Sequence, residues 1–401
     1  MKRTRFGRRS SLPREAEELL WLASGLAESG SHAEDGFWQV RLSLAVDALL
    51  RSGSEETLNA TLDHLYTANP NAYDALADML EARAECGARK IEEKTSSDAE
   101  INEARTGILL IAAPILAWSR FSIPANKLPA AVLANLRVHL TAHVLADNIE
   151  LALSDILFSP DQLPQGYCET TRFAAQLGWA AEHGHDLVVD AETLPETSRF
   201  LSDVRYILAA VSFKHGEPIF RWQETDGTRE QSTTQWRTQG GACLTSVLAG
   251  CAIELVLPDA FFAASRHADR VSRPYSIRAS VAFLTTTLNV PPNRLRAVVA
   301  AFYENQLEEY RISFMVAGSD DVVHGVVWPL LGVEDDGAEI FNQIEVALRE
   351  CSVTDIVQLD NRFAMEYCED CGAPMYPTPE GETVHAELPE DAVEQVPRHL
   401  H

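Results

Sequence analysis

The first quarter of the chain has the hydrophobic spacing of amphipathic helices. Behind Pro13, apolar residues recur at steps of three and four, and similar segments continue to about Gly87. Ser54 is a candidate N-cap, and Pro70 interrupts the chain before the last segment. We therefore predict a helical domain over residues 15–88, with four short helices packed as antiparallel hairpins.

Residues 89–105 are polar and predict a linker after the helical domain. Beyond them an internal repeat occurs: IELALSD at 149–155 aligns with IELVLPD at 253–259, and a looser copy, DIVQLD, lies at 355–360. Each copy follows a helix-like segment. Strand-like pairs precede the second and third copies, at residues 206–213 with 219–222 and at 310–317 with 322–331.

These patterns predict an α+β protein of mixed α/β character. The N-terminal helical domain is followed by three tandem strand-strand-helix-strand repeat units and a short C-terminal Cys-x-x-Cys element. The predicted boundaries are 1–14 for a basic tail, 106–200, 201–275 and 276–367 for the three units, and 368–401 for the C-terminal element and its tail.

Composition and charge narrow the classes of partner. The 401 residues are 46% apolar, which is enough for two or three hydrophobic cores. The formal net charge is −26, although residues 1–14 carry basic side chains and no acidic one. Because the acidic body repels a phosphate backbone, nucleic acid can bind only through this tail. A disordered, solvated terminus is the simpler interpretation of the tail.

Neither a secretion signal nor a membrane span is predicted. Glu15, Glu17 and Glu18 stand where a signal peptide needs apolar residues. The longest apolar run, residues 108–118, is shorter than the roughly 18 to 20 residues of a membrane-spanning helix. The 7 cysteines are an odd number at low density, which argues against a disulfide framework and favours a reducing compartment. We expect a cytoplasmic location.

The strongest chemical signal is the pair Cys368 and Cys371, followed by Gly372. Their spacing is similar to one knuckle of a zinc ribbon, because a tight turn directs both sulfurs at one metal ion and glycine permits a positive φ. A structural zinc site needs four ligands, and we choose His385 as the third. The other candidates are His399, His401, Cys351, Cys168 and a second subunit.

Two further interpretations of the cysteine pair remain open, a reduced structural pair and a redox pair. Redox function is the weaker of the two. Glu369 and Asp370 would raise the thiol pKa values, and Pro374 and Pro377 argue against the following helix that redox pairs use.

A second set of candidate ligands lies on a helix predicted over residues 128–145. His139, His143 and Asp147 recur every four residues, which is the spacing of one helix face. The glutamate of the zinc-hydrolase His-Glu-x-x-His pattern is missing, and a polar surface face is the simpler interpretation.

The weaker candidate functional residues have simple structural explanations. A turn explains His183, His185 and Asp186. Turn capping explains the repeated Asp155 and Asp259, and the alternative is that these two residues face a common cleft. Packing or flexibility explains the glycine pair at 240–241, because no phosphate-binding lysine follows it. We identify no catalytic residue and no nucleotide-binding motif.

The two ends of the chain carry a resemblance. SSLPREAEELLWLASGLAESGSHAEDGFW at residues 10–38 and EYCEDCGAPMYPTPEGETVHAELPE at 366–390 resemble a family of uncharacterised bacterial proteins, the domain of unknown function family 2863. The resemblance covers the whole chain. It implies a bacterial cytoplasmic protein and supplies no activity.

Three classes of function follow from these observations. We rank first a non-enzymatic interaction or regulatory protein with a zinc-stabilised C-terminal element and a protein partner, with a homo-oligomer as one arrangement. The alternatives are a metal-dependent enzyme with a cleft between repeat units, and an RNA- or ribosome-associated factor that binds through the N-terminal tail.

Overall fold

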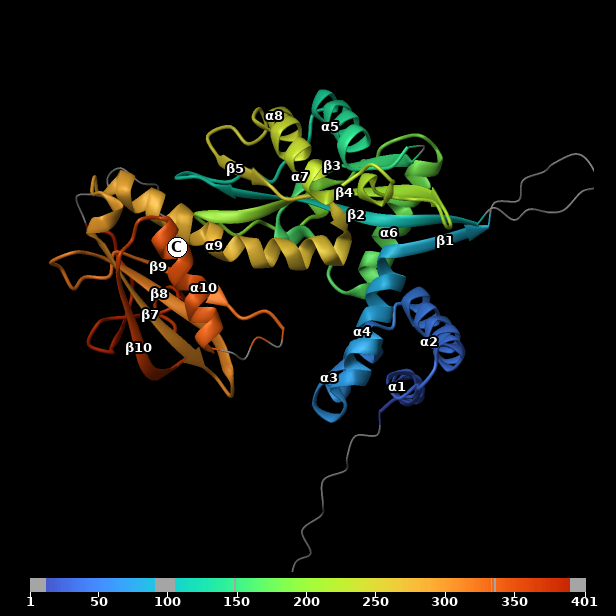
Figure 1. Cartoon of the computed structure of the whole chain (residues 1–401), viewed down its shortest axis with the longest axis horizontal. Helices are drawn as coiled ribbons and strands as arrows, with labels where there is room; N and C mark the ends of the chain where they lie inside the picture. The colour runs from blue at the N-terminus through green and yellow to red at the C-terminus, as the bar shows by residue number, and fades with distance from the viewer. Residues whose placement is uncertain (1–11, 91–104, 148, 333, 335–336, 390–401) are drawn as a thin grey trace, which may run out of the picture.

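The computed structural model describes residues 12–90, 105–147, 149–332, 334 and 337–389. A bundle of helices lies at one end, a six-stranded sheet lies in the middle, and a four-stranded sheet lies at the other end (Figure 1). The mixed α+β class and the helical N-terminal part are therefore confirmed. Within the described residues, no helix combines the length and the apolar character needed to cross a bilayer.

Local sequence signals set the limits of the bundle helices. The Ser31 hydroxyl accepts the Glu34 N–H, and the Asn69 side chain accepts the Ala72 N–H, so both residues act as N-caps. Ser54 precedes a helix as predicted, but its side chain makes no cap bond. Leucines from all four helices meet in one core. The helices are α1 (Arg14–Ala27), α2 (His32–Ser52), α3 (Glu55–Ala68) and α4 (Pro70–Glu85).

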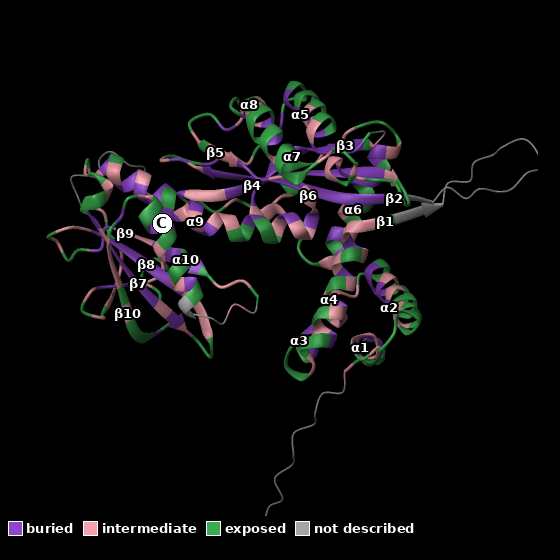
Figure 2. Cartoon of the chain, viewed as in Figure 1, coloured by how far each residue is buried: buried purple, intermediate pink, exposed green. Residues whose placement is uncertain are grey.

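The six-stranded sheet is antiparallel throughout and has the order β1-β2-β4-β3, with β5 and β6 also paired to β2. Helices cover both faces, which explains why β2 and β4 are almost continuously apolar and buried (Figure 2). The strands are β1 (Cys86–Lys90), β2 (Arg105–Trp118), β3 (Glu150–Phe158), β4 (Ser202–Lys214), β5 (Ala252–Leu255) and β6 (Asp259–Ala260), and the helices are α5 (Ala130–His143), α6 (Tyr167–Glu182), α7 (Arg229–Gln235) and α8 (Gly241–Leu244).

The four-stranded sheet has the order β10-β7-β8-β9, in which only β10 runs parallel to its neighbour β7. A helix connects β9 to β10 and packs on one face, while the C-terminal segment packs on the other. The elements are β7 (Leu295–Tyr303), β8 (Leu307–Val316), β9 (His324–Pro329), α10 (Gly337–Glu350), β10 (Asp355–Ala364) and the short hairpin of β11 (Tyr376–Pro377) and β12 (Thr383–Val384).

One long helix, α9 (Phe261–Thr287), runs along both sheets (Figure 1). Its first half buries Phe261, Ala264 and Ala268 against the six-stranded sheet. Its second half packs Ile277 and Leu284 into the core of the four-stranded sheet. Pro274 lies between the two halves and removes one intrahelical hydrogen bond there.

The predicted repeat is not confirmed. Strands from the first two predicted units belong to one sheet, and only the third unit has a sheet of its own. The strand expected at residues 219–222 is instead a 3-10 turn at Arg221–Gln223, with Phe220 bridged to Leu145. The ends of the predicted linker lie in β1 and β2, and residues 91–104 lie outside the described residues, as does the basic tail up to residue 11.

Two carboxylates attach the helical bundle to the rest of the protein. Glu55 accepts the N–H groups of Tyr167 and Cys168 at 3.0 and 2.8 Å, at the start of α6. Glu85 accepts the Phe262 N–H at 3.0 Å, at the start of α9. A carboxylate is stabilised at a helix N-terminus by the free N–H groups and the helix dipole. Burial nevertheless raises the pKa of Glu85 to about 7.

Substitution of Glu85 by Gln tests this contact. The raised pKa means that Glu85 binds a proton more tightly in the folded protein than in the unfolded chain. Proton binding at Glu85 therefore contributes to the free energy of unfolding, and this contribution is complete below about pH 4.5 and is lost as the pH rises to about 7. Relative to Glu85→Gln, the free energy of unfolding of the wild type should fall over this window, by about 3 kcal/mol at most.

Urea denaturation at several pH values measures the difference. Exposed Glu217 provides the matched control, since Glu217→Gln should show no such slope against the wild type. A constant difference between wild type and Glu85→Gln from pH 4.5 to 7.5 would contradict the assignment.

Candidate metal centre

Cys368 and Cys371 lie in a tight turn between β10 and β11. The Gly372 N–H donates to the Cys368 carbonyl, and the Cys368 N–H donates to the Ala373 carbonyl, both at 2.8 Å. Gly372 has φ 73°, a left-handed conformation that favours glycine. The turn therefore has the geometry predicted for a zinc knuckle.

The backbone of this turn stabilises the Cys368 thiolate. The N–H groups of Cys371 and Asp370 point at the Cys368 sulfur and lower the pKa of its thiol. A thiolate, and not a thiol, is the metal ligand. The neighbouring Asp370 charge acts in the opposite direction but has a smaller effect.

The hairpin of β11 and β12 returns the chain to the knuckle and positions His385. Tyr376 pairs with Val384, and the turn is closed by a 2.8 Å hydrogen bond from the Thr378 N–H to the Glu382 carbonyl. His385 follows directly, and its Nε2 lies 3.3 Å from the Cys371 Sγ. The ligand atoms of the two cysteines and the histidine all lie within 4.8 Å of one another.

A carboxylate lies behind the histidine ring. The Nδ1 of His385 is 3.4 Å from a carboxylate oxygen of Glu387, on the ring atom that does not face the cysteines. Histidines that bind metals commonly donate their other ring N–H to such a carboxylate. The Glu387 N–H donates to the Val322 carbonyl at 2.9 Å, which ties this part of the segment to the four-stranded sheet.

A buried arginine on β8 holds the base of the knuckle. Arg311 has no exposed surface, and its guanidinium donates to the carbonyls of Glu366 at 2.6 Å and Met375 at 2.7 Å, one on each side of the cysteine turn. Glu309 supplies the counter-charge at 2.6 Å. The ring of Tyr367 lies 5.1 Å from the guanidinium carbon.

Close packing fixes the rest of the segment. Ser313 donates to the Pro377 carbonyl at 2.5 Å, and Thr383 donates to the Glu366 carboxylate at 2.5 Å. Tyr376 lies directly over Gly325 of β9, where a Cβ atom would come within 2.2 Å of the aromatic ring. A glycine is therefore required at that position for the segment to lie on the sheet.

The donor set suits a zinc ion. With Zn–S and Zn–N bonds of about 2.3 and 2.0 Å, a tetrahedral site separates sulfur from nitrogen by about 3.6 Å, close to the distance between Cys371 and His385. Among the described residues only these three ligands, Cys368, Cys371 and His385, form such a group. Cys168 lies in the helical bundle and Cys351 packs on the core of the four-stranded sheet, while His399 and His401 fall outside the described residues.

The redox interpretation gains no support from the local structure. Redox Cys-x-x-Cys pairs use a helix N-terminus, whereas this turn leads to the short strand β11. The expectation that Glu369 and Asp370 raise the thiol pKa values is wrong for Cys368, because the N–H groups of the turn lower the pKa of its thiol by more than the Asp370 charge raises it.

The second predicted ligand set does not come together. The rings of His139 and His143 stack at 5.8 Å, but His143 lies 3.0 Å from the Gln239 side chain and Asp147 pairs with Arg221 at 3.2 Å. The part of the chain that the structure describes contains no metal-ligand group with these residues.

The weaker candidates have structural partners. Asp155 pairs with Lys127 and accepts the Val189 N–H, whereas Asp259 pairs with Arg229. They do not converge, because β3 and β6 are separated by β4 and β2. The ring of His183 stacks on Trp179, beside His185, and Asp186 pairs with Arg137. Gly240 lies against the Trp236 ring and has a packing role.

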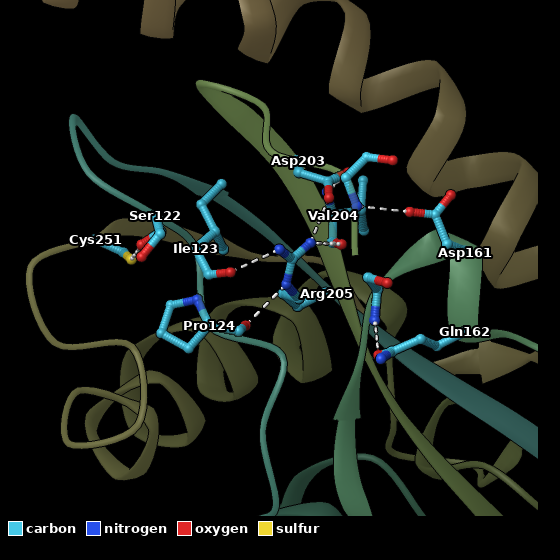
Figure 3. A network of polar contacts seen from close by, with 11 residues as sticks. Ser122, Ile123, Pro124, Asp161, Gln162, Asp203, Val204, Arg205 and Cys251 are labelled. Carbon is cyan, nitrogen blue, oxygen red and sulfur yellow. Dashed lines mark hydrogen bonds and ion pairs between the residues drawn. The ribbon is translucent and has the colours of Figure 1, made fainter. Parts of the chain in front are cut away.

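Sequence reasoning missed two buried arginines, Arg311 and Arg205. Arg205 of β4 donates to the carbonyls of Pro124 and Ile123 at 2.9 and 2.8 Å and pairs with Asp203 (Figure 3). Each arginine follows an acidic residue by two positions, which places both side chains on one face of a strand. An acid-x-Arg pattern inside an apolar strand is the signal that could have identified them.

Comparison with known proteins places the chain in a family. The chain belongs to the family described as protein of unknown function (DUF2863), whose model matches residues 4–399. No curated protein and no solved structure matches it.

Replacing Arg311 by Met should release the cysteine segment. The change leaves Glu309 buried without its counter-charge and removes the donors to two carbonyls, so we expect a loss of about 3–5 kcal/mol in the free energy of unfolding. Hydrogen exchange should rise first in residues 365–389.

An exposed Arg–Glu pair provides the control. Arg349→Met breaks the surface pair with Glu345 and should change the free energy of unfolding by about 0.5 kcal/mol or less. Equal effects of the two substitutions would show that Arg311 does not anchor the segment.

Proposed function

We propose that residues 366–387 form a zinc-binding element that stabilises a non-enzymatic interaction protein. The observation that carries the zinc assignment is the convergence of Cys368, Cys371 and His385 within 4.8 Å. Two thiolates and an imidazole are soft to intermediate ligands that suit zinc better than calcium or magnesium.

The position of the element supports a structural and not a catalytic role. Cys371 is exposed, and the knuckle is a loop at the protein surface. Catalytic zinc needs a shaped cavity that excludes water around an open coordination position. A zinc ion here would join the knuckle to the β11–β12 hairpin. Arg311 donates hydrogen bonds to the backbone of the same segment. A reducing compartment, the cytoplasm in our proposal, keeps both thiols available.

The helical bundle supports the interaction role. Its first two helices expose the large apolar side chains of Trp21, Phe37, Val40 and Leu44, each between 48% and 61% accessible. A groove of about 420 Å³ between α1 and α2 is lined by apolar and acidic side chains, among them Trp21, Leu44, Glu15 and Glu18. Large exposed apolar patches mark interaction sites.

Charge defines the kind of partner. Residues 14–85 contain 14 acidic and 4 basic residues, so positive charge on a partner favours its binding to the bundle. An amphipathic helix with apolar residues on one face and lysines on the other matches both the groove and its surroundings.

Zinc analysis of purified, chelator-free protein tests the first part. We expect about one zinc ion per chain, or one per two chains if the cysteines pair across a dimer. The double substitution Cys368→Ser with Cys371→Ser should abolish binding and make residues 365–389 sensitive to protease, while the helical bundle stays resistant.

Two further variants define the ligands. Cys243→Ser with Cys251→Ser removes two thiols from another part of the fold and should leave zinc content unchanged. His385→Ala should weaken zinc affinity at least tenfold, and an unchanged affinity would remove His385 from the ligand set. Wild-type protein without zinc would overturn the metal assignment.

A synthetic leucine–lysine amphipathic helix tests the docking groove by fluorescence polarisation at physiological salt. Leu44→Glu should weaken binding at least tenfold, because it places a charge in the apolar contact. Val138→Glu adds the same charge at an equally exposed apolar position on α5 and should have no such effect. If both substitutions leave binding unchanged or strengthen it equally, the attraction is only electrostatic and the groove is not the site.

A further inference from the structure

A small cavity lies where β4 meets the middle of α9. It encloses about 170 Å³ and is separate from the cysteine element. Polar groups come from both sides, and Leu116 and Val204 add an apolar wall. The polar lining comprises Ser202, Asp203 and Tyr206 of β4 and Asp269, Ser272, Tyr275 and Ser276 of α9.

Tyr206 is the most informative group in this cavity. The residue is 98% buried as part of the sheet core and also lines the cavity, and its hydroxyl has no hydrogen-bond partner within the described part of the chain. Burial and the nearby carboxylates of Asp269 and Asp203 raise the pKa of this phenol above its ordinary value. The hydroxyl is therefore neutral and free to bond to a ligand.

The cavity has a carboxylate on each side, and only the one from β4 forms an ion pair. Asp203 pairs with Arg205 (Figure 3). Arg273, one turn after Asp269 on α9, pairs with Glu334 at 2.7 Å and acts on Asp269 only through its charge. Across the described residues, no ion pair is formed by Asp269. Burial raises the pKa of both carboxyl groups, Asp203 and Asp269.

We propose that this cavity binds a small organic ammonium ion. Asp269 supplies the charge, the Tyr206 hydroxyl accepts an N–H, and the rings of Tyr206 and Tyr275 with Leu116 surround the alkyl part. Anions are repelled by the carboxylates. Two carboxylates, one already paired with an arginine, supply too few oxygen ligands for a calcium or magnesium ion.

The site joins β4 to α9 within the core that they share, to which both Tyr206 and Tyr275 belong. Tyr206 lies in the six-stranded sheet, whereas Asp269 and Tyr275 flank Pro274, where α9 passes from one sheet to the other. A bound ammonium ion therefore links β4 to the helix at the point where Pro274 removes a backbone hydrogen bond.

Saturation-transfer NMR on the full-length protein tests the proposal, with n-butylammonium as the probe and n-butanol as its uncharged control. Butylammonium should bind saturably and butanol at least tenfold more weakly. Asp269→Asn should weaken butylammonium binding at least tenfold, and Tyr206→Phe, which only removes the hydroxyl, should weaken it by a few-fold. Asp63→Asn, at an exposed position on α3, should leave it unchanged.

Several outcomes would overturn the proposal. Equal binding of butanol would show an apolar cavity without charge recognition, and competition by magnesium at equal concentration would show an inorganic cation site. Binding that is unaffected by Asp269→Asn would place the ligand elsewhere. Far-ultraviolet circular dichroism establishes that each variant is folded, so a loss of binding is not a loss of structure.

Discussion

The packing of α9 against two sheets is the constraint on which the arrangement of the chain depends. A helix of 27 residues is about 40 Å long, so its two halves reach separate cores. The first turn of the same helix also receives Glu85 from the bundle, and Arg266 in its second turn pairs with Glu81. One rigid element thus contacts all three parts of the protein.

The candidate metal centre depends on a second buried contact. Its ligands lie on loops, which by themselves hold side chains loosely. Arg311 compensates because its guanidinium is rigid, fully buried and bonded to the backbone on both sides of the cysteine turn. The four-stranded sheet, through Arg311, therefore fixes the position of the cysteine turn. The candidate ligands and Arg311 thus lie on the same short segment.

Local patterns predicted much of this structure. The bundle helices and the knuckle followed from spacing, caps and one Cys-x-x-Cys pair, all of which act within a few residues. The sequence offered His385 only as one of several candidate ligands for the cysteine pair. Its geometry required the β11–β12 hairpin, whose two-residue strands carry almost no sequence signal.

Long-range pairing was not predictable in the same way. The similarity of residues 149–155 to 253–259 indicated equivalent units, yet β3 pairs with β4 while β5 and β6 pair with β2. Partner choice of this kind depends on tertiary packing and not on the strand sequence alone. The partners of Arg311, two carbonyls more than 50 positions away, likewise have no local signature.

The order of elements along the chain has a consequence during protein synthesis. The cysteine segment covers one face of the four-stranded sheet, where Val298, Met315 and Val322 are buried beneath Tyr376. All of the strands that it covers are made before it. On the ribosome this apolar face therefore emerges uncovered, and it stays accessible to chaperones or to other nascent chains until the final segment arrives.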